Sequence, residues 1–343
     1  MVINRQTAVI NEWDRIYCEM LKSVIKNGSK VQNRTGIDCI SDEGYYFKLN
    51  LEECFPILET KKVVIKNALT ELLWIYQAQS NDVSWLKERN NPIWNEWEID
   101  ENGYWNAVQM VNVNGKLEKQ EVKKYFGKEY AGTIGTAYGW INNKFKRPQY
   151  VLEQLKNNPT DRRMVISMWQ DEYLKTAVLP SCVWSSEWKV KDNKLNAFVH
   201  QRSCDIPLGL PFNVSQYAIL LSLFAKVSNL EVGNLNWSIM DAHIYENQLE
   251  GIKLQLKRYD LMCYYEDFIK KHTDLEIEEE YNYLKENDEE KFNVLDLLIT
   301  KEKPTLFLAD KDDFFDYDNS ENNEDIKVLK YKSLPFIKMP IAQ

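Results

Sequence analysis

The sequence predicts a single α+β domain that spans residues 1–343. Segments typical of helices and segments typical of strands are intermingled along the whole chain, as in that fold class. No internal repeat and no clear linker divides the sequence. Of the 343 residues, 44% are hydrophobic and 13% are aromatic, so the chain can bury a sizeable core.

The first quarter of the chain predicts a helix, a strand and a second helix. Residues 11–27 carry apolar side chains at helical spacing and end at an Asn-Gly pair, a typical helix stop. The alternating segment 45–51 predicts a strand. Residues 62–79 are apolar on most faces and too long for a strand. They predict a buried helix that carries Glu71 inward.

Two segments have the composition of insertions. Residues 108–130 predict an inserted hairpin and a charged helix, and the acidic, weakly amphipathic residues 259–303 predict an exposed helical insertion. Between and after them we expect, in order, a Gly-rich loop at 133–140, a helix at 149–157, strands at 163–169, 183–190 and 195–201, a core helix at 215–230, a strand running into a helix at 237–245, and an acidic loop at 312–325.

Charge and cysteine usage exclude several classes of protein. The net charge of −9 argues against broad nucleic-acid binding, which depends on excess basic charge. The six cysteines form no C-x-x-C pair, which argues against a zinc cluster and against a disulfide framework. The N-terminus has no apolar signal region, and no run approaches the ~18 apolar residues of a membrane span. We therefore expect a cytoplasmic protein without a metal site.

Cys182 lies in the segment LPSCVW, with no second cysteine at metal or redox spacing. Free cysteines are among the most buried residue types, which favours a core thiol. The polar segment 200–213 supplies Arg202, and a guanidinium beside a thiol lowers its pKa and activates it as a nucleophile. An ion pair in a loop explains Arg202 equally well. On these residues alone both roles of Cys182 stay open.

Other residues are open to a functional and a structural interpretation. The pair Arg162–Arg163, in a chain that otherwise favours lysine, suggests bidentate binding of phosphate. Glu71 is a carboxylate within an apolar helix, and burial would raise its pKa toward an acid–base value. His243 and Tyr245 are more often structural, yet they could bind a sugar. Trp94 and Trp97 suit either a core or the wall of a pocket for a planar heterocycle.

Taken together and in order, these motifs resemble the folate-dependent thymidylate synthase family. The similarity covers most of the chain outside the two insertions. Its segments are RTG (34–36), FPILETKK (55–62), ELLW (71–74), IWNEW (93–97), YG (138–139), NPTDRR (158–163), LPSC (179–182), QRSCD (201–205), LGLPFN (208–213), DAHIY (241–245) and the terminal IKMPIAQ.

The resemblance implies a mixed β-sheet packed with helices, and the reductive methylation of dUMP to dTMP. The cosubstrate implied is 5,10-methylenetetrahydrofolate, with no metal. A thiolate would add to C6 of uracil and so make C5 nucleophilic toward the folate methylene. The catalytic positions that the resemblance implies are Cys182, Glu71, Tyr138, Arg202 and Asn213. Among these, Asn213 would read the uracil edge, and Glu71 and Tyr138 would transfer protons.

The resemblance also implies two binding sets and a homodimer, in which Arg162 and Arg163 serve the partner's site. The dUMP set is Arg34, Arg162, Arg163, Gln201, Arg202, Ser203, Cys204, Asp205, Asn213, His243 and Tyr245. The folate set is Lys61, Ile93, Trp94, Trp97, Leu179, Asp205, Gly209, Ile341 and Ala342.

Three positions depart from the usual family pattern. Val183 follows the nucleophile where His is usual, Glu187 replaces Gln and would place a charge near the pocket, and Gln343 replaces an apolar last residue.

Two other functions are compatible with the scaffold. A dUMP hydroxymethylase shares the thiol addition. A hydroxymethylase that acts on a cytosine nucleotide is disfavoured by Asn213. A non-catalytic nucleotide-binding regulator is disfavoured because Cys182 occurs together with Glu71 and Tyr138.

Overall fold

The computed structural model describes residues 3–33, 35–113 and 116–341. A six-stranded sheet forms its centre, with the strand order β1-β2-β8-β7-β6-β5. Strands β7 and β8 are parallel and the other neighbours are antiparallel, so the sheet is mixed, as expected. The strands are β1 (Ser29–Val31), β2 (Cys39–Asn50), β5 (Val165–Ser167), β6 (Val183–Lys191), β7 (Lys194–Asp205) and β8 (Glu231–Tyr245).

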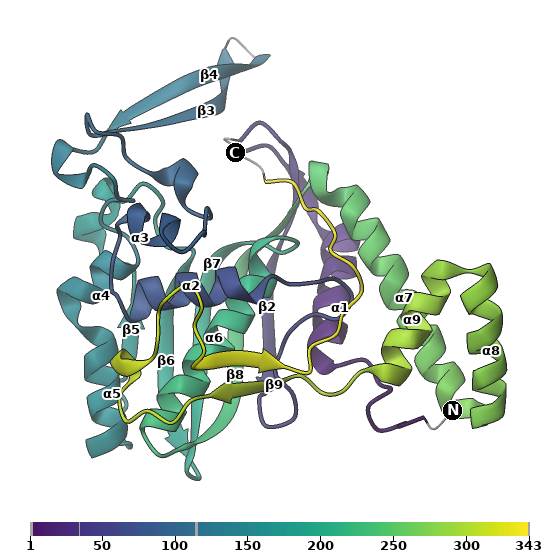
Figure 1. Ribbon diagram of the computed structural model, residues 1–343. Coiled ribbons are helices and arrows are strands. Elements are labelled where there is room, and N and C mark those ends of the chain that lie inside the picture. The colour runs from purple at the N-terminus through teal and green to yellow at the C-terminus, as the bar shows by residue number, and fades with distance from the viewer. Residues whose placement is uncertain (1–2, 34, 114–115, 342–343) are drawn as a thin grey trace.

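Helices cover one face of this sheet (Figure 1). Helix α6 (Gly209–Val227) packs on β7 and β8 and contacts α2 (Ile65–Tyr76), while α1 (Glu12–Asn27) packs beside β2. Side chains from these elements form the main core, in which Trp237 of β8 stacks on Phe47 of β2. Helix α6 is long and apolar enough to span a membrane by length and composition alone, but 78% of that window is buried inside the protein.

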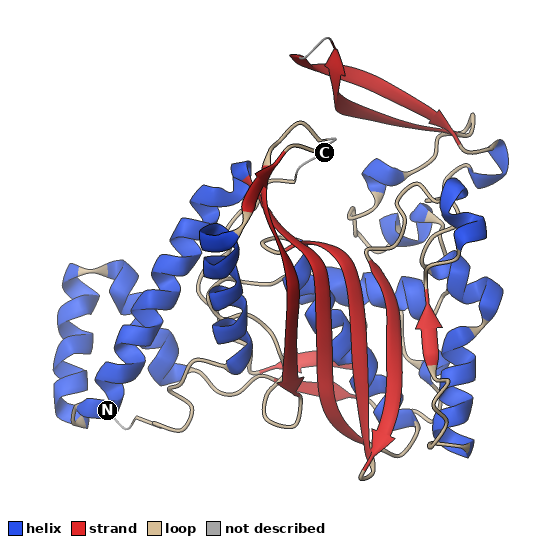
Figure 2. Cartoon of the chain, turned by 180° about the vertical axis from the view of Figure 1, so that it is seen from behind, coloured by secondary structure: helices blue, strands red, loops and turns tan. Residues whose placement is uncertain are grey.

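The opposite face of the sheet carries no helix, as Figure 2 shows from behind. Large apolar side chains are exposed there, because alternate residues of each strand point away from the helices. They include Tyr46 of β2, Trp184 of β6 and Met240 of β8, with exposed fractions of 59%, 37% and 64%.

Smaller elements flank the sheet on both sides. Helices α3 (Val83–Lys87), α4 (Gly139–Phe145) and α5 (Arg147–Asn157) lie on the side of β5. On the other side lie α7 (Leu249–Lys271), α8 (Asp274–Asn287) and α9 (Glu289–Thr300). A separate two-stranded sheet joins β9 (Thr305–Leu308) to β10 (Ile326–Leu329).

The segments expected as insertions adopt two different structures. Residues 259–303 are helical, as predicted, and form the end of α7 together with α8 and α9. The helix predicted within 108–130 is wrong, because β3 (Tyr104–Val113) and β4 (Lys116–Tyr125) pair along their whole length. Cross-strand contacts such as Tyr104–Tyr125, with ring centroids 4.9 Å apart, outweigh the local helical preference of a Lys- and Glu-rich run.

Candidate active site

Cys182 and Arg202 meet where β6 and β7 lie side by side. Cys182 directly precedes β6, and the backbone N–H of Arg202 donates to its carbonyl at 2.9 Å. The guanidinium also donates to two other backbone carbonyls, those of Pro180 at 2.6 Å and Ser181 at 3.1 Å. Its Nη2 thereby lies 3.8 Å from Sγ of Cys182. A fixed positive charge at this distance favours the thiolate over the neutral thiol.

Tyr138 contacts the same cysteine from the opposite side. Its hydroxyl accepts a hydrogen bond from the backbone N–H of Cys182 at 3.1 Å. The residue has a φ of +46° at the start of α4, and Gly139 follows it because a Cβ there would lie 2.0 Å from the carbonyl oxygen of Ser80. Burial, and then the nearby cysteine, raise the pKa of Tyr138 well above its usual range. The phenol is therefore a protonated, positioned donor.

A chain of buried amides connects the sheet to α2. The indole N–H of Trp237 donates to Oε1 of Gln201 at 3.1 Å, and Nε2 of Gln201 donates to Oδ1 of Asn213 at 3.3 Å. Nδ2 of Asn213 then donates to Oε1 of Gln216 at 3.3 Å, and Nε2 of Gln216 donates to Oε2 of Glu71 at 2.5 Å. An indole can only donate and an ionised carboxylate can only accept, so the two ends fix the orientation of all three amides.

Glu71 is buried at the end of this chain. Its other oxygen, Oε1, accepts a hydrogen bond from the indole N–H of Trp94 at 2.7 Å. Burial raises the pKa of Glu71, and the hydrogen bonds from Gln216 and Trp94 oppose that shift. The inward orientation of Glu71 predicted from the sequence is confirmed.

Asp241 organises a second polar group at the end of β8. Its carboxylate accepts from the hydroxyls of Ser41 at 2.6 Å and Ser203 at 3.0 Å, and Nδ1 of His243 lies 3.3 Å away. Burial opposes ionisation, but these hydrogen bonds bring the pKa of Asp241 down to about 2. Tyr245 packs edge-on against His243, with ring centroids 5.2 Å apart. The predicted residues Ser203, His243 and Tyr245 therefore lie together.

A third group surrounds Asp205, at the end of β7. Its carboxylate accepts from Nε2 of Gln248 at 2.9 Å and from the backbone N–H of Leu208 at 3.1 Å. Burial raises the pKa of Asp205. Lys61 is also buried, which lowers its pKa to about 8, and its Nζ donates to the carbonyl of Pro207 at 2.5 Å. A carboxylate and a buried ammonium group therefore lie near the end of β7.

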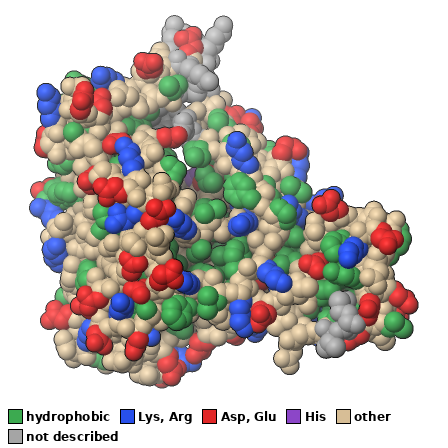
Figure 3. Space-filling model, viewed as in Figure 1, with side chains coloured by type: hydrophobic (Ala, Val, Ile, Leu, Met, Phe, Trp, Pro, Cys, Tyr) green, Lys and Arg blue, Asp and Glu red, His purple; other side chains and the backbone are tan. Residues whose placement is uncertain are grey.

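The aromatic residues of the segment IWNEW line the space near Tyr138. Trp94 packs edge-on against Trp97 at 5.5 Å and against Tyr138 at 5.3 Å between ring centroids. Three more residues of the expected folate set are partly buried: Ile93, Leu179 and Gly209, the first residue of α6. Figure 3 shows hydrophobic side chains gathered in the hollow between the part with α2 to α5 and the C-terminal segment.

Several expected site residues lie apart from these groups. Arg162 and Arg163 are exposed, and Arg163 pairs with Asp161 at 2.9 Å. The side chain of Cys204 is buried in the core, and Ile341 is 51% exposed. Arg34 and Ala342, and likewise Gln343, lie outside the described residues.

The expectation for Glu187 is wrong. Its side chain is 59% exposed on the open face of the sheet, where Oε1 lies 3.3 Å from Nε2 of His200. A β-bulge between Val183 and Ser185 shifts the alternation of β6 by one residue and turns Glu187 outward.

Two residues of the site were missed in the sequence. Gln216 follows Asn213 by three positions on α6, and Asp241 precedes His243 by two on β8. Helical spacing and strand alternation place each missed residue on the same face as its neighbour, and that signal could have revealed both.

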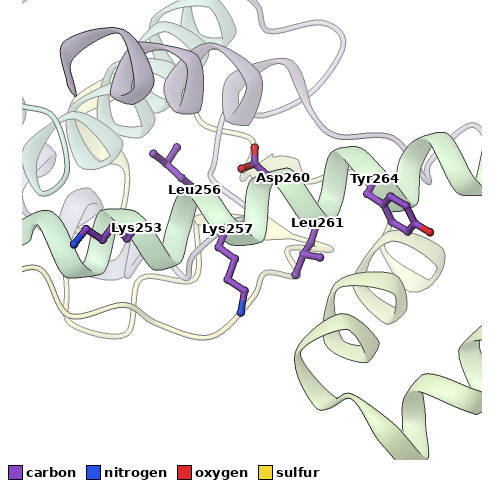
Figure 4. Close-up of a pocket in the computed structure, with 6 residues that line it drawn as sticks. All are labelled: Lys253, Leu256, Lys257, Asp260, Leu261 and Tyr264. Carbon is purple, nitrogen blue, oxygen red and sulfur yellow. The ribbon is translucent and has the colours of Figure 1, made fainter. Parts of the chain in front are cut away.

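A surface groove of about 510 Å³ on α7 is separate from this site (Figure 4). It is lined by Lys253, Leu256, Lys257, Asp260, Leu261 and Tyr264. Within the described residues, no group of three His, Cys, Asp or Glu side chains could hold a metal ion.

In this fold a thiol lies beside a fixed guanidinium and a buried phenol, an arrangement typical of the active sites of enzymes. A family model described as thymidylate synthase matches residues 15–297. A thymidylate synthase of Clostridium beijerinckii is 42% identical over 246 residues, covering 72% of this chain and 82% of the relative. That of Staphylococcus haemolyticus is 31% identical and covers 97% and 100%.

A solved structure shows the same relationship at the level of the fold. The thermostable thymidylate synthase A of Bacillus subtilis aligns with a TM-score of 0.67 and 28% identity, covering 94% of this chain and 96% of that one. The chain belongs to the thymidylate synthase family. It is therefore a methyltransferase that converts dUMP to dTMP, with 5,10-methylenetetrahydrofolate as cosubstrate.

Proposed function

We propose that the Cys182 thiolate adds to C6 of dUMP, with Arg202 as the cation that stabilises the thiolate. The observation that carries this role is the 3.8 Å separation of Arg202 Nη2 and Cys182 Sγ, in a guanidinium already fixed by two carbonyl groups. Addition at C6 turns C5 of uracil into an enolate carbon, which is the nucleophile that methylation needs.

Glu71 and Tyr138 are the groups we assign to proton transfer, including the loss of the C5 proton. Glu71 is buried, and burial raises its pKa, which suits a group that accepts and returns a proton. Tyr138 stays protonated, and its hydroxyl is held next to Cys182 by the hydrogen bond that it accepts from the backbone N–H of that residue.

Asn213 is the residue we assign to base recognition. The amide chain leaves Asn213 one free lone pair on Oδ1 and one free N–H on Nδ2. These match N3–H and O4 of uracil, and cytosine presents the reverse pattern. Because Gln201 and Gln216 hold the amide from both sides, it cannot flip to accept cytosine without breaking both hydrogen bonds.

The polar group around Asp241 is suited to the sugar and phosphate of dUMP. His243 and Tyr245 would bind the ribose, and Ser203 with Arg202 would bind the phosphate. Further phosphate contacts are assigned to Arg34 of the same chain, and to Arg162 and Arg163 of a second copy. Gln201, Cys204 and Asp205 complete this set through their places on β7.

The folate cosubstrate supplies the one-carbon unit and a hydride. Asp205 and Lys61 would bind its polar heterocycle, since Asp205 is the last residue of β7 and the buried Lys61 donates to the nearby carbonyl of Pro207. The aromatic and apolar walls assigned to it are Trp94, Trp97, Ile93, Leu179 and Gly209, with Ile341 and Ala342 of the C-terminal tail closing over it.

A homodimer is the assembly we propose, in the cytoplasm. The uncovered sheet face exposes the apolar side chains Tyr46, Trp184 and Met240 on three of its strands, which is unusual for a monomer. A second copy packed there would cover it. The exposed Arg162 and Arg163 are then free to reach the partner's site.

The assay for this proposal follows dihydrofolate by absorbance after dUMP and methylenetetrahydrofolate are mixed with the enzyme. We expect dihydrofolate and dTMP in equal amounts, because the hydride comes from the folate. Mass spectrometry of the nucleotide identifies the product. A hydroxymethyl product without dihydrofolate would contradict the proposed mechanism, as would a folded protein that binds dUMP and makes neither product.

A further inference from the structure

We propose that Gln248 is a positioning residue that couples the C-terminal tail to Asp205, and that Gly251 forms the seat of this tail on α7. The inference rests on the proposed function of Asp205 in folate binding. It assigns a role to two residues that no motif of the site includes.

The side chain of Gln248 is fully buried between β8 and α7. Its Nε2 lies 2.9 Å from Oδ2 and 3.2 Å from Oδ1 of Asp205, and 3.2 Å from the carbonyl oxygen of Pro340 in the tail. Its Oε1 accepts the backbone N–H of Tyr245 at 3.1 Å, which fixes the orientation of the amide. One amide group therefore joins the folate-side carboxylate to the tail.

The two N–H groups of this amide divide between the two partners. The oxygens of Asp205 lie in nearly the same direction from Nε2, so they share one N–H, and the other N–H is directed to the Pro340 carbonyl. Loss of the amide therefore removes one restraint on the carboxylate of Asp205 and one restraint on the tail.

Gly251 gives an independent reason to place the tail here. A Cβ at this position would lie 2.8 Å from Sδ of Met339 and 3.2 Å from Cγ2 of Ile337. Its backbone is ordinary α-helix, so no unusual φ requires glycine. Glycine within a helix costs about 1 kcal/mol relative to alanine. The close approach of the tail explains why the helix carries it.

The rest of the tail is anchored up to this point. The backbone N–H of Leu334 donates to the carbonyl of Glu59 at 2.8 Å, and Arg258 of α7 donates to the carbonyl of Pro335 at 2.7 Å. Ile337 and Met339 are each only 6% exposed, whereas Ile341 is 51% exposed. The boundary between the anchored and the exposed tail thus lies at Pro340, the residue that Gln248 holds.

The first test needs no turnover. We would digest the unliganded full-length chain with a carboxypeptidase and follow the release of C-terminal residues by mass spectrometry. Gln248→Met keeps the buried volume but removes the amide, and Gly251→Ala pushes on Met339. We expect both variants to release the residues that precede Ile341 several-fold faster than the wild type.

The matched control is Gln255→Ala, on the same helix. Gln255 is also fully buried and donates to the Thr60 hydroxyl at 2.9 Å, so its loss removes an amide that serves another part of the fold. We expect unchanged digestion in this variant. Wild-type digestion rates in both Gln248→Met and Gly251→Ala would overturn the proposal. If Gln248→Met does not fold, Gly251→Ala alone decides the seat of the tail.

The second test distinguishes the coupling of Asp205 to the tail from a general loss of structure in the variant. In Gln248→Met we expect the KM for methylenetetrahydrofolate to rise on the order of tenfold, and the KM for dUMP, whose set includes Asp205 and Tyr245, to rise much less. Hydrogen bonding from Gln248 lowers the pKa of Asp205, so its loss raises that pKa. The acid limb of kcat/KM for the folate then moves to higher pH, whereas Gly251→Ala leaves that limb in place.

Equal changes in both KM values, or an unshifted acid limb in Gln248→Met, would show that Gln248 is only structural. If the wild type makes no dihydrofolate, the proposed function fails. The digestion experiment still tests the seat of the tail in that case, so the two failures are distinguishable.

Discussion

Nη2 of Arg202 lies 3.8 Å from Sγ of Cys182, and a backbone hydrogen bond joins the same two residues. The sheet therefore fixes the thiol and the guanidinium relative to each other before any substrate binds. Such preorganisation lets the charge act on the thiolate without a rearrangement during the reaction. In the proposed function the same guanidinium also binds the phosphate of the nucleotide.

Replacement of the nucleophile is the most direct test. We expect Cys182→Ser to abolish dTMP formation, because a hydroxyl is a far weaker nucleophile than a thiolate at neutral pH, while dUMP still binds. Turnover and dUMP affinity are measured in parallel. Cys263→Ser is the control, since that partly buried thiol lies on α7, and it should retain wild-type rates. Substantial synthesis by Cys182→Ser would remove the cysteine from its role.

Shared active sites predict complementation between two inactive variants. Arg163→Ala chains lack a phosphate contact, and Cys182→Ala chains lack the nucleophile. If Arg163 acts in the partner's site, a hybrid dimer has one site with both defects and one intact site. We expect mixed preparations to regain up to half of the wild-type activity per hybrid dimer. Confirmed hybrids without any activity would count against sharing across the interface.

Base selection should change with Asn213→Asp. A protonated Asp can donate to N3 of cytosine and accept from its amino group, so we expect loss of dUMP turnover and a gain with dCMP. Mismatches at a buried polar site can reach ~10⁴-fold in discrimination. Glu187 does not interfere, because it faces away from the site toward His200. We would compare kcat/KM for both nucleotides in wild type and variant; an unchanged ratio refutes base reading by Asn213.

The stability of the fold should depend on a buried ion pair between Glu59 and Lys301, with exposed side-chain fractions of 1% and 4%. Burial raises the pKa of Glu59 to about 7, although Lys301 opposes this. The folded pKa of Glu59 thus exceeds the unfolded one, so the stability gained from protonation of Glu59 is complete below about pH 4.5 and is lost as pH rises through about 7. Lys301→Met removes the opposing charge and raises that pKa further.

We therefore expect Lys301→Met to destabilise the fold more at pH 8 than at pH 5, by about 3–5 kcal/mol at the higher pH. Urea unfolding at the two pH values measures this difference. Lys257→Met is the control, because Lys257 pairs with Glu290 at the surface and its loss should change stability little at either pH. An equal effect of Lys301→Met at both pH values would show that Glu59 does not titrate in this window.

The residues assigned to the reacting centre were predicted from short motifs with specific chemistry, and the structure brings two of them, Cys182 and Arg202, together. The segments around Cys182, Arg202 and Asn213 each retain the residue types that the reaction needs. Hydrophobic periodicity also predicted α1, α2 and most of the strands of the sheet. Helix α6, however, begins at Gly209, six residues before its predicted start. Its first turn contains Pro211, which is tolerated only near a helix start.

What the sequence by itself determined, then, is the family, the chemistry and the residue types of the site, because these depend on local pattern. The tertiary structure alone decided which side chains meet. A bulge turned Glu187 away from the pocket, strand pairing made β4 from a helix-like run, and folding brought Gln216 to Glu71 and Gln248 to Pro340. These outcomes depend on register and on contacts between residues far apart in the chain, which no local preference contains.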